Sequence, residues 1–143
     1  MIPSDARKAG LNGAPIVVAI DDRPANLLAI QALTEELDVR LVSFTSGRSA
    51  VEYLTRAANV ALVLLDVRMP EMDGFETATQ IRASARDSSV PIIFMTAIHQ
   101  DDDYVDRAYE AGAVDFLLKP IQPRIFRSKI RIFVELQRHR QQL

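Results

Sequence analysis

The chain of 143 residues contains no cysteine. This absence excludes a disulfide scaffold, a thiolate metal site and a cysteine nucleophile. No apolar run approaches the roughly 20 residues needed to cross a bilayer, and residues 1–15 lack the apolar core of a secretory signal peptide. We therefore expect a cytoplasmic protein that does not enter a membrane. Neither charge sign dominates, since 17 basic residues face 19 acidic ones, and a net charge of −2 disfavours direct binding of nucleic acid.

The composition that is present is that of an ordinary globular domain. Hydrophobic residues make up 48% and charged residues 25% of the chain, and the length suits one domain. Residues 1–14 mix proline, serine, glycine and charged residues with few apolar ones, which predicts a flexible leader. The pattern of a folded domain begins at residue 15.

Short apolar runs alternate with longer amphipathic stretches from there on. The runs cover residues 15–20, 40–44, 60–65, 91–95 and 114–118. Those at 16–20 and 60–65 are continuously apolar, which is typical of strands buried on both faces of a parallel sheet. Leu27, Ile30, Leu33 and Leu37 recur at helical spacing after Pro24, which suits the first turn of a helix. Further helices are predicted over residues 46–56, around 75–81, over 101–111 and over 122–142. The alternation predicts a layered α/β fold with right-handed crossovers.

Polar groups follow four of the five apolar runs. Asp21 and Asp22 follow the first run, Asp66 the third, Thr96 the fourth and Lys119 the fifth. Ligands of open α/β sheets bind beyond the carboxyl ends of the strands. An aspartate there often only caps the next helix, but Lys119 cannot cap a helix N-terminus. The joint occurrence therefore favours a functional site.

These groups suit a divalent cation and a phosphate. Three carboxylates close together repel each other and do not all stay ionised without a cation. Mg²⁺ prefers such oxygen ligands and a substrate phosphate, with Mn²⁺ as an alternative ion. A hydroxyl and an ammonium group add donors for phosphate oxygens. The pattern predicts phosphoryl transfer with an aspartate as nucleophile, and the spacing leaves open which aspartate attacks.

In these motifs the chain resembles the receiver domain of two-component response regulators. The matching stretches are IDDRPANLLAIQALTEEL, VALVLLDVRMPEMDG, IIFMTA and AGAVDFLLKP, in the family's order and spacing. The resemblance covers residues 15–133, which leaves 134–143 as a helical extension or linker. It implies a flavodoxin-like, doubly wound (βα)5 fold with a five-stranded parallel sheet in the order 2-1-3-4-5 and an extended C-terminal helix.

The resemblance also implies a role for each polar residue at the strand ends. Asp66 matches the phosphoacceptor, and Asp21 and Asp22 match the acidic pair that holds Mg²⁺ together with Asp66. Arg68 matches the position whose backbone carbonyl completes the metal site.

Further residues match the family's switch. Thr96 matches the hydroxyl that moves to the phosphoryl group, and Phe116 matches the aromatic that turns inward, although a static core phenylalanine is the simpler interpretation. Lys119 matches the lysine that pairs with the phosphoryl group, and its bond to Pro120 matches the family's cis peptide. We also hypothesise that Ile98 slows dephosphorylation by excluding water.

The implied function is signalling. A histidine kinase or phosphotransfer protein donates the phosphoryl group, and phosphorylation switches the face of the fourth helix, fifth strand and fifth helix toward a partner or downstream domain. The domain catalyses only its own phosphorylation and dephosphorylation, so it is not an enzyme with an external substrate. A homodimer is expected through that face or through the C-terminal helix.

The predicted last helix carries a second stripe. Ile132, Leu136, His139 and Leu143 recur near heptad spacing. The helix is either a solvated basic face or a dimerising or signalling helix that projects from the domain. The end of the chain at Leu143 suggests a receiver module taken from, or linked to, a larger signalling protein.

Three alternatives stay open. A small phosphohydrolase with an aspartyl-phosphate intermediate shares the residue types, but such enzymes place two aspartates two residues apart on the first strand and usually add a cap domain. A phosphorylation-independent interaction module would not need the full set of polar residues. A flavin-binding protein would need a phosphate-cradling loop after the first strand, where the acidic pair repels phosphate.

Overall fold

The computed structural model describes residues 13–97 and 102–141, and within them the chain alternates between strands and helices. The elements are β1 (Ile16–Ile20), α2 (Pro24–Thr34), β2 (Arg40–Phe44), α3 (Gly47–Leu54), β3 (Val60–Asp66), α4 (Gly74–Ser84), β4 (Ile92–Ala97), α5 (Asp102–Glu110), β5 (Asp115–Lys119) and α6 (Pro123–Gln141). Most of the predicted leader lies outside these residues, as do Ile98 and Leu143.

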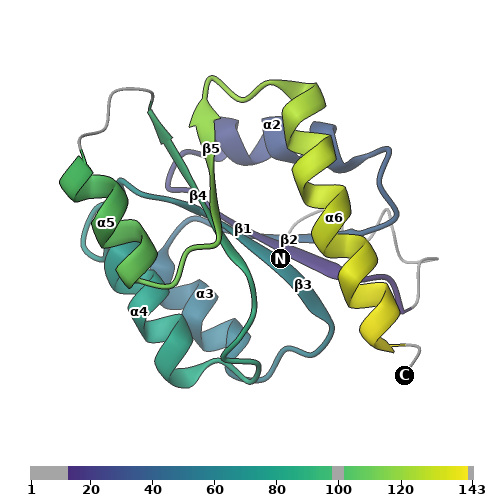
Figure 1. The fold of residues 1–143 in the computed structure, drawn as a ribbon, viewed down its shortest axis with the longest axis horizontal. Helices are drawn as coiled ribbons and strands as arrows, with labels where there is room; N and C mark the ends of the chain where they lie inside the picture. The colour runs from purple at the N-terminus through teal and green to yellow at the C-terminus, as the bar shows by residue number, and fades with distance from the viewer. Residues whose placement is uncertain (1–12, 98–101, 142–143) are drawn as a thin grey trace.

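The five strands form one parallel sheet in the order β2-β1-β3-β4-β5. This is the predicted doubly wound order. Helices α2 and α6 cover one face of the sheet, and α3, α4 and α5 cover the other (Figure 1). The two layers of core follow from the continuously apolar strands, because every residue of β1 and β3 is buried and alternate side chains enter opposite layers.

The structure confirms the predicted starts of α2 and α3 and the predicted end signal of α5. Pro24 occupies the first turn of α2, and Ser46 caps α3 by accepting a hydrogen bond from the Ser49 N–H. Gly112, just past α5, has a φ of +94°, in the left-handed region that glycine adopts without strain. Among the described residues, no helix combines the length and the apolar character needed to cross a membrane.

Some element boundaries differ from the prediction. Helix α2 ends at Thr34, so Leu37 lies beyond it, although Leu37 is still buried beside Val39 as the chain turns into β2. Strand β4 extends through Thr96 and Ala97, and β5 includes Lys119. These residues pair along the sheet, Thr96 with Leu118 and Ala97 with Lys119, so the strands hold the polar side chains rigidly.

Candidate phosphoacceptor site

Three carboxylates meet at the carboxyl ends of β1 and β3. Ile20 pairs with Leu65 in the sheet, so Asp21 and Asp22 emerge beside Asp66, the last residue of β3. One carboxylate oxygen from each of the three lies within 4.8 Å of the other two. Asp21 is fully buried and Asp66 is only 7% exposed. Buried oxygen ligands at this spacing fit a small hard cation such as Mg²⁺.

Asp21 is fixed from three sides. Its Oδ1 accepts a hydrogen bond from the backbone N–H of Arg23 at 2.9 Å, and its Oδ2 accepts one from the side chain of Asn26 at 3.0 Å. The Lys119 ammonium approaches Oδ2 at 3.4 Å. These donors compensate the burial of a charge that would otherwise be costly.

Helix capping does not account for the acidic pair. The N-cap of α2 is Arg23, and no side chain caps that helix. Capping is instead the role of Asp73, which accepts a hydrogen bond from the Glu76 N–H at the start of α4. Asp21 and Asp22 therefore do not cap α2, and the contact they make as a pair is with Asp66 in the three-carboxylate cluster.

Lys119 is the positive centre of the site. Its Nζ lies 2.8 Å from Asp66 Oδ1, and its side chain is 30% exposed. Burial raises the pKa of the Asp66 carboxyl, against the hydrogen bond from Lys119, and the charges of Asp21 and Asp22 add to that rise. Burial opposes the charge of Lys119, but the hydrogen bond and charge of Asp66 outweigh it and raise the pKa of the ammonium. Lys119 therefore stays protonated at neutral pH.

A cleft of about 540 Å³ opens over these groups. Its lining includes Asp22, Asp66, Arg68, Thr96, Ala97 and Lys119. Thr96 is 4% exposed, and the small Ala97 beside it leaves room at the rim. The cleft thus brings a carboxylate together with a hydroxyl and an ammonium, and the hydroxyl and the ammonium are donors of the kind that bind phosphate oxygens.

The remaining predicted residues take different places. Arg68 is exposed at the mouth of the cleft, two residues after Asp66. Phe116, in β5, is half-buried within a row of rings, 6.5 Å from Phe94 and edge-on to Tyr109 at 5.6 Å between centroids. The Lys119–Pro120 peptide bond is cis, the isomer that the resemblance implies.

Sequence reasoning missed the contact of Asn26 and the close packing of Gly74. Asn26 holds Asp21 from the first turn of α2, and its only signal is a position five residues after that aspartate. Gly74 starts α4 so close to β3 that an added Cβ would lie 2.5 Å from the Asp66 carbonyl oxygen and 2.8 Å from the Val67 Cα. This close approach has no local signal in the sequence, because it depends on how α4 packs against the end of β3.

Comparisons with known proteins agree with this geometry. The model of the response regulator receiver domain family matches residues 17–131. The chain is 35% identical to the two-component response regulator ORR5 of Oryza sativa subsp. japonica over 111 residues, 78% of this chain and 82% of that protein. It is 40% identical to the sensor protein GacS of Pseudomonas syringae pv. syringae over 114 residues, 78% of this chain but 12% of that protein.

A solved structure also matches. The receiver domain of the sensor histidine kinase PA1611 from Pseudomonas aeruginosa PAO1 superposes with a TM-score of 0.75 at 27% identity, covering 86% of this chain and 99% of that one. That structure has a magnesium ion coordinated in its active-site cleft. The family match spans most of this chain, from residue 17 to residue 131. The chain therefore belongs to the response regulator receiver domains of two-component signalling.

Proposed function

We propose that Asp66 accepts a phosphoryl group from a phosphohistidine of a histidine kinase or phosphotransfer protein. One observation supports this above all: the Lys119 ammonium lies 2.8 Å from Asp66, in a cluster of three carboxylates that faces an open cleft. A carboxylate of this kind is an accessible nucleophile, and its neighbours are placed to hold the product.

The transfer is an in-line displacement at phosphorus. An Asp66 oxygen forms the new P–O bond while the P–N bond to the imidazole breaks, and the imidazole nitrogen keeps the electron pair and takes up a proton. Lys119 and Thr96 donate hydrogen bonds to the phosphoryl oxygens. The carboxylates of Asp21, Asp22 and Asp66 and the backbone carbonyl of Arg68 would hold Mg²⁺ or Mn²⁺, which supplies positive charge against the negative phosphoryl oxygens.

Phosphorylation is the signal in this proposal. The acyl phosphate on Asp66 draws Thr96 toward it, Phe116 repacks, and the face of α5, β5 and α6 changes its affinity for a partner or a downstream domain. Hydrolysis of the same bond resets the domain. The chain thus acts on itself in the cytoplasm and turns over no external substrate.

Intact-mass spectrometry after incubation with acetyl phosphate and Mg²⁺ tests the proposal. We expect one added phosphoryl group on the wild type, and none on Asp66→Asn or without a divalent cation. The matched control is Asp73→Asn, because Asp73 lies at a neighbouring helix start and asparagine caps a helix as well as aspartate does. This control should be labelled like the wild type.

Two results would contradict the proposal. An unmodified wild type that also releases no inorganic phosphate would indicate an interaction module that works without phosphorylation. Continuous turnover of small phosphate esters would indicate a phosphohydrolase instead.

A further inference from the structure

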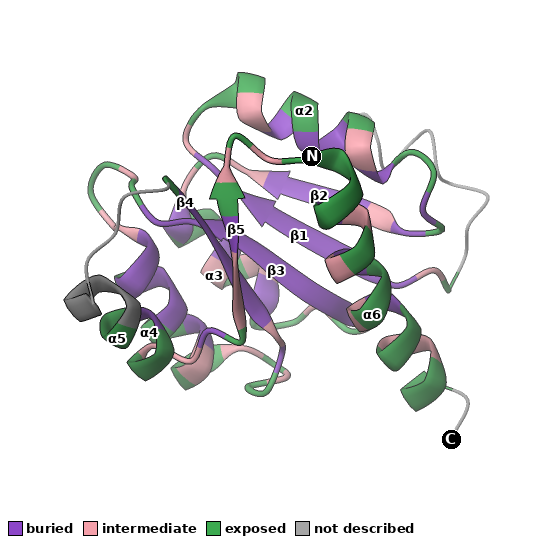
Figure 2. Cartoon of the chain, turned by 45° about the horizontal axis from the view of Figure 1, so that its top comes forward, coloured by how far each residue is buried: buried purple, intermediate pink, exposed green. Residues whose placement is uncertain are grey.

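Asn26 lies in the first turn of α2, beside the cluster of three carboxylates. Its Nδ2 donates a hydrogen bond to Asp21 Oδ2 at 3.0 Å, and its side chain lines the cleft of about 540 Å³. Figure 2 shows β1 and β3 in the colour of buried residues, whereas α2 mixes buried and exposed positions. Asn26 is half-buried at this boundary. Its amide therefore reaches a fully buried carboxylate from the rim of the cleft.

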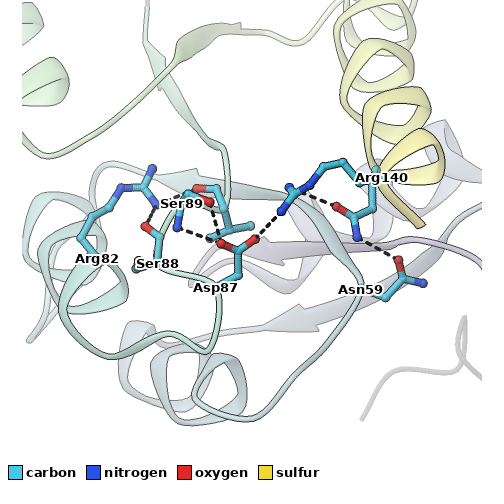
Figure 3. Close-up of polar contacts among 8 residues, drawn as sticks. Asn59, Arg82, Asp87, Ser88, Ser89 and Arg140 are labelled. Atoms are coloured by element: carbon cyan, nitrogen blue, oxygen red, sulfur yellow. Dashed lines mark hydrogen bonds and ion pairs between the residues drawn. The ribbon is translucent and has the colours of Figure 1, made fainter. Parts of the chain in front are cut away.

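The contacts of Asn26 differ from those of Asn59, which lies just before β3. The Asn59 amide joins separate segments of the chain. Its Nδ2 donates to the carbonyl oxygens of residues 13 and 14, and its Oδ1 accepts a hydrogen bond from Gln137 at 3.1 Å (Figure 3). Across residues 13–97 and 102–141, the one hydrogen bond of the Asn26 side chain goes to Asp21. The Asn26 amide thus serves the carboxylate cluster and joins no backbone segments.

Asp21 Oδ2 receives donors from two side chains, and the two differ in what else they bind. The Lys119 ammonium lies 3.4 Å from this oxygen but only 2.8 Å from Asp66 Oδ1, so two carboxylates share it. In the proposed transfer, Lys119 also donates to the phosphoryl oxygens. The buried Asp21 then loses part of a donor, which is costly for a charge out of contact with water. The Asn26 amide is the donor to Oδ2 that the transfer does not use.

We propose that Asn26 is a positioning residue, which holds the Asp21 carboxylate in the orientation that binds the divalent cation. The inference rests on the proposed function and adds to it a residue outside the polar groups at the strand ends. Asn26 acts through Asp21 and does not itself touch the reacting atoms. Hydrogen-bond partners that orient a metal-binding carboxylate are typically worth 10–100-fold in metal affinity.

A neutral amide suits this role better than a second cationic side chain. The amide nitrogen donates to the carboxylate and carries no net charge. The cluster therefore keeps the negative charge that attracts a cation, whereas a lysine or arginine in place of Asn26 would cancel part of it. The backbone N–H of Arg23 fixes Asp21 Oδ1 in the same neutral way, at 2.9 Å. The two neutral donors together hold both oxygens of Asp21.

Isothermal titration calorimetry with Mg²⁺ tests the proposal without any phosphate donor. Asn26→Leu keeps the approximate size of the side chain and removes the donor, and Asn26→Ala removes the donor without filling the space. Both should bind Mg²⁺ about 10-fold more weakly than the wild type. The matched control is Gln31→Leu, the same change from amide to leucine on α2, because no hydrogen bond or ion pair of the described residues links Gln31 to the cluster. It should bind Mg²⁺ like the wild type.

Labelling by acetyl phosphate over a range of Mg²⁺ concentrations supplies the second readout. Asn26→Leu should need about 10-fold more Mg²⁺ for its half-maximal rate and then approach the wild-type maximum, because a bound cation itself holds Asp21. A variant that is merely misfolded would lose rate at every Mg²⁺ concentration.

Three results would overturn the proposal: wild-type Mg²⁺ affinity in both Asn26 variants, an equal loss in Gln31→Leu, or a wild type that binds no Mg²⁺. If Mg²⁺ binds but no protein is labelled, the proposed phosphorylation fails, and the calorimetry alone decides the role of Asn26.

Discussion

Lys119 is the residue on which the chemistry of the site depends most clearly, because it is the ammonium that touches both Asp66 and Asp21. Replacement by methionine keeps much of the side-chain volume but removes the charge. We predict that Lys119→Met slows phosphorylation by acetyl phosphate about 100-fold, as expected when one donor to a developing phosphoryl charge is lost. Time-resolved intact mass measures the rate.

The matched control for that prediction is Lys129→Met. Lys129 also forms an ion pair, with Asp115, but it lies on α6 away from the cleft. A Lys119→Met rate within a few-fold of the Lys129→Met rate would show that the ammonium is dispensable.

Asp87 supplies a prediction about pH. The hydrogen bond from the Ser89 hydroxyl, with the nearby charge of Arg140, lowers the pKa of this carboxyl below its ordinary 3.8. A lowered folded-state pKa stabilises the fold above the unfolded value, and the stabilisation disappears as the pH falls through the folded value. Because Asp87 is partly exposed, we predict that Asp87→Asn costs less than about 1 kcal/mol at pH 7.

Urea unfolding of the wild type and Asp87→Asn between pH 7 and pH 3 measures this effect. The difference between the two proteins should shrink as the pH falls. In a Ser89→Ala background the Asp87→Asn substitution should cost less at pH 7, because the main donor is already gone. A difference that grows toward pH 3 would contradict the assignment.

At the scale of elements, the junction of β3 and α4 has little room. A Cβ on Gly74 would collide with backbone atoms of Asp66 and Val67, which cannot move aside as a flexible side chain would. We predict that Gly74→Ala destabilises the fold by about 1–3 kcal/mol and slows labelling of Asp66. Urea unfolding checks the first effect and intact mass the second. Gln80→Ala, on the exposed side of α4, should change neither, and a neutral Gly74→Ala would refute the steric argument.

The elements themselves were largely predictable from the sequence. The runs that became β1 and β3 are continuously apolar, a pattern typical of short strands buried on both faces of a parallel sheet. Local spacing overestimated α2, because Leu37 meets the core from the turn after the helix and needs no further helical turn. Helical periodicity reports which residues are buried, and it does not report how the chain brings them there.

The contacts within the site were less predictable. Asp21 and Asp66 meet Lys119 across 98 and 53 residues, and only the strand order places them together. That order came from the family resemblance. The link from Gln137 to Asn59 spans 78 residues and has no local signal at all. Such contacts depend on how complete elements pack, which short motifs do not encode.

At the scale of the whole molecule, ion binding and stability are linked. A cation that binds the folded cluster and not the unfolded chain stabilises the fold, by about 1.4 kcal/mol at ten times its dissociation constant. We predict this gain with Mg²⁺ in the wild type and its near loss in Asp22→Asn. Without a divalent cation, Asp22→Asn should be at least as stable as the wild type, because one repelling carboxylate is gone.

Thermal unfolding with Mg²⁺, and with EDTA, measures that linkage. Asp73→Asn serves as the control and should keep the full Mg²⁺ effect, since Asp73 is not part of the three-carboxylate cluster. Equal gains for Asp22→Asn and the wild type would place the ion elsewhere.

Helix α6 also has a mechanical consequence. It begins four residues after Lys119, at the edge that holds the cleft, and its 19 residues make a rod about 28 Å long. A tilt of about 10° at its first turn therefore moves its far end by about 5 Å, given that length. Because Arg140 and Gln137 hold that far end to the loops of Asp87 and Asn59, the rod cannot swing until those contacts break. A tilt of that size exceeds the reach of both contacts, so it would break the ion pair and the hydrogen bond together.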